Sequence, residues 1–129
     1  MNMQEAFDKA YLGVVAQGEP SLGRNRLRCK YRGDKKARCP IGFLIEDKDY
    51  KRSMEGIKID FLLYNRKLPD YLSSLNVVFL VMLQRAHDEA TSYSDFTEQF
   101  KRNMNRIALI YELKVPETKE SKSGQAKSL

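Results

Sequence analysis

Apolar side chains recur at helical spacing near both ends of this 129-residue chain, and that periodicity constrains the fold most strongly. Residues 3–15 carry them three or four positions apart, and Gly18 with Pro20 then provides a stop signal. Residues 94–111 repeat the pattern in a stripe of Phe96, Phe100, Met104, Ile107 and Tyr111. The spacing predicts an amphipathic helix in each segment, with one buried face.

A third helix is predicted over residues 76–90, whose first half is apolar on all sides and so favours a central position in the core. Asp70 or Ser73 could cap it. Its apolar run, 77–83, is far shorter than the roughly 20 residues that span a bilayer, which argues against membrane insertion.

The segments between these helices give weaker signals. Pro40 can occupy the first turn of a short helix over residues 41–45. Residues 57–68 fit either a short helix or a strand that ends before Pro69.

From Leu27 to Cys39 the apolar period changes from 3.6 to 2, because Leu27, Cys29 and Tyr31 alternate with basic residues and Gly33-Asp34 offers a turn. This pattern predicts a two-stranded β-hairpin with its odd positions on the core. The expected fold class is therefore α+β: a small, mainly helical single domain with the hairpin packed on a central apolar helix. We expect residues 1–115 to be globular and the polar residues 116–129 to form a disordered tail.

The net positive charge of the chain comes entirely from residues 24–38, which we call the basic arm. Its eight cations against one acid give a local net charge of +7, whereas the remaining residues carry 15 bases and 16 acids. Such a patch predicts an anionic partner, nucleic acid or an acidic protein surface, because phosphate contacts release counterions. The candidate contact residues are Arg24, Arg26, Arg28, Lys30, Arg32, Lys35, Lys36 and Arg38.

An alternative interpretation of the arm is structural. Basic side chains on the outer face of an edge hairpin also discourage aggregation, so the patch could be incidental to function. Tyr31 is the sole aromatic residue in the arm and is expected in the core, which argues against a dedicated single-strand binder.

Two cysteines are too few for a disulfide-stapled secreted domain, and no signal peptide is visible, so a cytoplasmic setting is expected. Across the predicted hairpin, Cys29 and Cys39 would be near-opposite neighbours. They could be core thiols, a disulfide or, with His87 and a carboxylate such as Asp88, zinc ligands. Structural thiols are favoured, because the Cys-x9-Cys spacing is not that of a zinc knuckle, and we expect no metal or cofactor.

A thiol hydrolase is a further alternative, since Cys39 before Pro40 could lie at a helix N-terminus and His87 could act as a base. Adjacent His87 and Asp88 on one helix should point about 100° apart and so fail to orient one another. No phosphate-binding glycine loop is present in the sequence, and the acids Glu46, Asp47 and Asp49 are expected in solvent. We therefore expect no enzymatic activity.

The segment YRGDKKARCPIGFLIEDKDYKRSMEG, with LQRAHDEA and FKRNMNRIALIYEL, resembles a family of small proteins of bacteriophages, prophages and mobile elements. The family pattern is C-x-YRG...C-x-x-G-x-LI-x-D...Y...MEG, followed by a helix with HD. A family glycine in the turn is replaced within DKKAR, so the turn type is open. The matching positions are Cys29, Tyr31, Arg32, Gly33, Cys39, Gly42, Leu44, Ile45, Asp47, Tyr50, Met54, Glu55, Gly56, His87 and Asp88.

The resemblance implies an accessory protein in the host cell cytoplasm that binds nucleic acid or a host or defence nucleoprotein, with anti-defence activity as one role. It carries over no catalytic residue. A protein-binding inhibitor or structural factor, with an incidental basic patch, is the main alternative.

Overall fold

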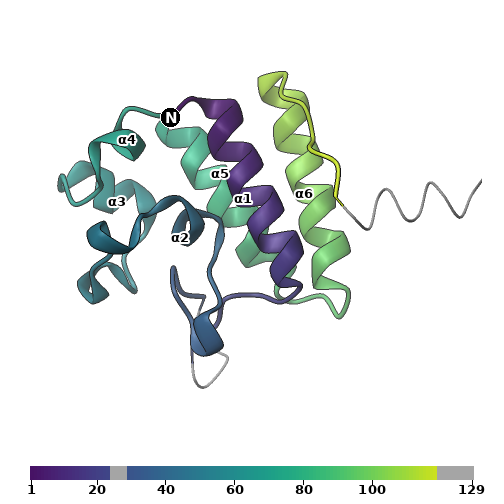
Figure 1. The fold of residues 1–129 in the computed structure, drawn as a ribbon, viewed down its shortest axis with the longest axis horizontal. Helices are drawn as coiled ribbons and strands as arrows, with labels where there is room; N and C mark the ends of the chain where they lie inside the picture. The colour runs from purple at the N-terminus through teal and green to yellow at the C-terminus, as the bar shows by residue number, and fades with distance from the viewer. Residues whose placement is uncertain (24–28, 119–129) are drawn as a thin grey trace, which may run out of the picture.

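The computed structural model describes residues 1–23 and 29–118, and its regular elements in these ranges are helical (Figure 1). The α-helices are α1 (Met3–Gln17), α2 (Pro40–Leu44), α3 (Ile59–Tyr64), α4 (Asp70–Ser73), α5 (Val77–Ala90) and α6 (Phe96–Tyr111). Three 3₁₀ turns complete the set: η1 (Asp34–Lys36), η2 (Asp47–Asp49) and η3 (Arg52–Met54). No helix within the described ranges is long and apolar enough to cross a membrane.

Helix α6 lies beside both α1 and α5, with α2, α3 and α4 gathered at one flank and residues 29–38 of the basic arm at one end (Figure 1). Helix α5 packs against α6, α2 and α3, whereas α1 packs against α2 and α6. The three long helices predicted from the apolar period are therefore confirmed. The predicted cap of α5 is wrong, because Asn76 accepts the Phe79 N–H at 3.0 Å while Asp70 and Ser73 belong to the separate α4.

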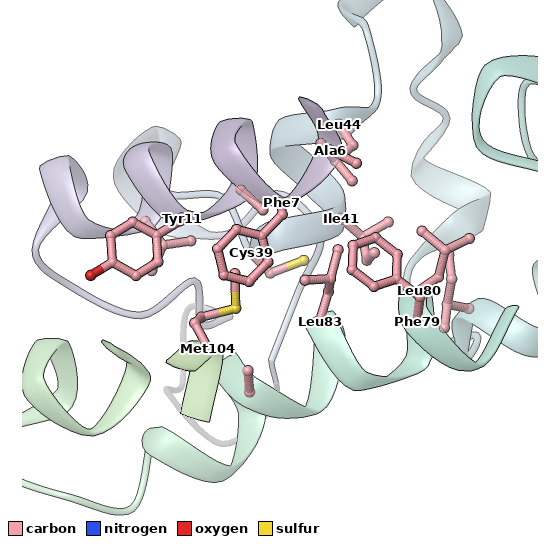
Figure 2. Packing of buried hydrophobic residues seen from close by; sticks show 14 of the residues in the cluster. Ala6, Phe7, Tyr11, Cys39, Ile41, Leu44, Phe79, Leu80, Leu83 and Met104 are labelled. Atoms are coloured by element: carbon pink, nitrogen blue, oxygen red, sulfur yellow. The ribbon is translucent and has the colours of Figure 1, made fainter. Parts of the chain in front are cut away.

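The core is built where α1, α2, α5 and α6 meet (Figure 2). Its largest fully buried side chains include Phe7, Ile41, Leu80, Leu83 and Met104. The first turn of α5 is not enclosed, however, since Val78 is 56% exposed. The prediction from the sequence, that this segment lies in the centre of the core, therefore overestimated its burial.

The predicted α+β class and two-stranded hairpin are wrong. Two isolated bridges, Leu22 with Cys29 and Arg32 with Arg38, are the only β-pairings, and the described residues contain no strand. The pairing across the turn stays short because two adjacent N–H groups of the arm take a side-chain acceptor: those of Tyr31 and Arg32 donate to the Glu55 carboxylate, at 2.9 and 3.0 Å. Only the Gly33 and Cys39 N–H groups, among the described residues, donate across the turn, to the Ala37 and Tyr31 carbonyls. The two-residue period reported burial correctly at Tyr31 and Cys39, which are in the core, whereas Cys29 is only half-buried and Leu27 lies outside the described residues. The domain limits remain predictions, and residues 119–129 of the predicted tail lie outside the described residues.

The arm reverses direction in a tight turn from Asp34 to Ala37. The Ala37 N–H donates to the Asp34 carbonyl at 3.0 Å, and both central residues have positive φ, 55° at Lys35 and 64° at Lys36. These values define a type I′ turn, for which Asn-Gly is the favoured sequence. A pair of lysines thus occupies a turn that disfavours them.

Helix α2 approaches the arm so closely that one position requires glycine. A Cβ atom added at Gly42 would lie 1.9 Å from the Tyr31 carbonyl oxygen. The contact joins the arm to the core, because Tyr31 is itself buried and its carbonyl accepts the Cys39 N–H at 3.2 Å.

We predict that Gly42→Ala lowers the free energy of unfolding by about 3 kcal/mol or more, because overpacking against backbone outweighs the gain of about 1 kcal/mol in helix propensity. Urea unfolding measures the change. Gly18→Ala is the matched control: its φ of 72° is strained for alanine, but no atom lies within 4 Å of the added Cβ. The control should lower the free energy of unfolding by only about 1 kcal/mol. Equal losses of stability in the two variants would contradict the close-packing argument.

Candidate nucleic-acid interface

The eight candidate cations of the basic arm are not equivalent. Arg24, Arg26 and Arg28 lie outside the described residues. Lys30 is half-buried, while Lys35 and Lys36 are exposed at the tip of the turn. The other two, Arg32 and Arg38, are engaged in contacts with the helical body.

Arg32 holds the arm to the segment that follows α2. Its Nη2 lies 2.9 Å from Asp47 Oδ1 and donates to the Ile45 carbonyl, also at 2.9 Å. The guanidinium stacks over the Tyr50 ring, 4.5 Å from the centroid. Only 19% of the side chain is exposed, so Arg32 is committed to the fold.

Arg38 is bound from two directions. Its guanidinium lies 3.1 Å from the same Asp47 oxygen that pairs with Arg32. The Gln17 amide, at the end of α1, accepts from the Arg38 N–H at 2.8 Å and donates to its carbonyl at 3.0 Å. Charge counting in the sequence could not separate these two arginines from the free lysines, and Asp47, expected in solvent alone, is their common partner.

Glu55 is a structural residue that appeared in the sequence only as a matching position of the family pattern, with no role assigned to it. Besides the two arm N–H groups, its carboxylate accepts the Tyr50 hydroxyl at 2.7 Å. Burial and this hydrogen bond raise the pKa of Tyr50 to about 12. Glu55 therefore links the arm to η3 and to the ring beneath Arg32.

The sequence-based expectation that His87 and Asp88 point apart is wrong. His87 Nδ1 lies 2.8 Å from Asp88 Oδ1, and Nε2 accepts the Ser21 N–H at 2.9 Å. These partners assign the imidazole proton to Nδ1. His87 is fully buried, and the hydrogen bond that it accepts from Ser21 joins α5 to the segment that leads into the basic arm.

Cys29 completes a cluster with His87 and Asp88, in which one ligand-type atom from each lies within 4.8 Å of the others. Burial, followed by the charge of Asp88 and a hydrogen bond to it, raises the pKa of the Cys29 thiol to about 12. A zinc ion needs a free imidazole nitrogen, whereas both ring nitrogens of His87 already have partners, Asp88 and the Ser21 N–H. The donor set does not suit zinc.

Cys39 lies outside that cluster and faces the core. It is fully buried, its Sγ accepts the Gly42 N–H at 3.4 Å, and burial raises its thiol pKa. Both cysteines are free, and Cys39 pairs with Tyr31 rather than lying opposite Cys29. A protonated, enclosed thiol lacks the thiolate that nucleophilic catalysis requires.

Comparison of the chain with known protein families, curated proteins and solved structures finds no match in any of the three. The function proposed below therefore depends on the sequence features of the chain and on the contacts described above.

We predict that Asp88→Asn increases the rate at which iodoacetamide alkylates Cys29 at pH 8 severalfold. Removing the carboxylate charge lowers the thiol pKa from about 12 and so raises the thiolate fraction. Mass spectrometry of the Cys29 peptide gives the rate, and its pH profile should shift to lower pH. Glu89→Gln removes the same charge from the next residue and is the control. An equal acceleration in both variants would contradict the assignment to Asp88.

Proposed function

We propose that this chain is a non-enzymatic accessory protein of a bacteriophage or mobile element that binds nucleic acid through its basic arm. The source and the accessory role rest on the sequence resemblance. The choice of the arm as the contact surface rests on its charge and on the conformation of its turn.

The observation that carries the proposal is the Lys35-Lys36 pair at the centre of the type I′ turn. A left-handed conformation costs roughly 1 to 2 kcal/mol for a residue with a Cβ, and Asn-Gly would avoid most of this cost. Both lysines are exposed, and no ion pair to either one is present among the described residues. Strain kept at an exposed, charged tip supports a binding role for those side chains.

The division of the arm's cations supports the same surface. Among the described residues, Arg32 and Arg38 are held by Asp47, so the cations of the arm available to a partner there are Lys30 and the two turn lysines. Arg24, Arg26 and Arg28 belong to the proposed contact set by their charge in the sequence. A cluster of cations of this kind suits the phosphates of a nucleic acid strand. An acidic face of a host or defence nucleoprotein is negatively charged, as phosphate is, and is the alternative partner.

The direct test is binding of labelled single- and double-stranded DNA and RNA across a salt series. We predict that the triple variant Arg26→Ser, Arg28→Ser, Lys30→Ser reduces the slope of log K against log salt by about two to three units, because each lost phosphate contact contributes roughly 0.7 to 0.9. A variant with Lys51, Lys67 and Arg102 replaced by Ser loses the same charge from exposed positions elsewhere. No binding by the wild type at low salt would refute nucleic-acid recognition and leave the protein partner.

The turn lysines give a second prediction, in which stability and binding move in opposite directions. Lys35→Asn with Lys36→Gly should raise the free energy of unfolding by about 1 kcal/mol, since it relieves the left-handed strain. The same variant should bind nucleic acid more weakly and with a reduced salt slope. Urea unfolding and fluorescence anisotropy measure the two effects. Unchanged binding would show that the turn lysines do not contact phosphate.

A further inference from the structure

A cleft of about 690 Å³ lies beside the base of the arm. Its walls come from Cys29 and Tyr31, from residues 55–60 and from one face of α5. The volume is within the range of small-molecule sites, which are mostly apolar with a few polar groups that orient the ligand. Ile57, Ile59 and Val81 supply the apolar part of this lining.

Gln84 presents an unused hydrogen-bond acceptor in this lining. Its Oε1 is buried and has no hydrogen-bond partner among residues 1–23 and 29–118, while its Nε2 donates to Asp88 Oδ2 at 3.4 Å. The Asp88 carboxylate fixes the orientation of the amide, because the flipped amide would place two acceptor oxygens together. An unpaired buried acceptor costs about 1–3 kcal/mol, so a ligand N–H group placed there would recover free energy.

Two of the three carboxylates that line the cleft are already used. Asp88 interacts with His87 Nδ1, the Gln84 amide and the Cys29 thiol, whereas Glu55 accepts two backbone N–H groups and the Tyr50 hydroxyl. The third carboxylate, Asp60, is exposed to solvent. The buried acceptor that remains is therefore a neutral amide oxygen, which suits a neutral N–H donor at that position. Two exposed cations, Lys58 and Arg85, also line the cleft, although Arg85 pairs with Glu89 at 2.8 Å.

We propose that the cleft binds an unpaired nucleobase, with an N–H group of the base edge donating to Gln84 Oε1, the ring between the apolar side chains and a phosphate near Lys58. A base combines the flat apolar body, the neutral donor and the adjacent anion that this lining suits. It could come from a free nucleotide or from a single strand held by the basic arm, and only the second source rests on the proposed function.

The test compares adenosine 5′-monophosphate with purine riboside 5′-monophosphate, which lacks the exocyclic amine and so has no N–H on its base edge. The wild type should bind the adenosine compound about tenfold more tightly, as expected for one hydrogen bond to a buried acceptor. Gln84→Leu should abolish this preference. Gln99→Leu on α6 is the control and should retain it. Titration followed by amide chemical shifts measures affinity and also reports whether each variant is folded.

A parallel experiment uses single-stranded oligonucleotides with adenine or purine as the base. If the preference appears only there and disappears in Gln84→Leu, the strand is the source. If it appears for mononucleotides and survives Lys35→Asn with Lys36→Gly, the cleft functions independently of the basic arm, even where oligonucleotide binding is absent. The proposal would be overturned by equal affinity for the two bases in both the mononucleotide and the oligonucleotide experiments. A preference that persists in Gln84→Leu would also overturn it.

Discussion

The Glu55 carboxylate is the acceptor on which the arrangement of the basic arm depends. Tyr31 and Arg32 sit where a second strand would supply their hydrogen-bond partners, and a buried N–H group without a partner would cost about 1–3 kcal/mol. One charged side chain accepts both N–H groups and adds the Tyr50 hydroxyl. The extended segment is thereby stable without a sheet, and its burial against Gly42 becomes compatible with an all-helical body in the described residues.

Glu55 binds the backbone of the arm, whereas Asp47 binds two of its charged side chains. The cations of the arm that the structure describes therefore form two groups. The arginines at positions 32 and 38 converge on Asp47, while the turn between them extends Lys35 and Lys36 into solvent. Asp47 is 80% exposed, so its ion pairs contribute little to stability by themselves. Their effect is geometric, since they hold both ends of the turn near η2. Arg32 and Arg38 thus fix the position of the turn, which leaves Lys35 and Lys36 exposed at its tip.

The sequence predicted the long helices because an apolar stripe at 3.6-residue spacing reports one buried face wherever the helix packs. The same logic identified Tyr31 and Cys39 as core residues. It failed for pairing, because alternation indicates which side of an extended segment is buried and not what accepts its backbone hydrogen bonds. The role of Glu55, which entered only as a position of the family pattern, could not be identified from the sequence, since Glu55 is distant in sequence from Tyr31. The His87–Asp88 contact was missed because helical angle alone ignores the reach of the two side chains.

Most polar groups near the arm are satisfied: His87 has two partners, and Glu55 and Asp88 have three each. Positive φ at Arg66 and Glu112 accompanies the ends of α3 and α6, where left-handed residues are common. Three departures lack such an explanation: the positive φ of the two turn lysines, the unpaired Gln84 oxygen, and the buried Arg32 Nε, which also has no hydrogen-bond partner among the described residues. Their location in and beside the arm therefore supports binding at this end of the molecule.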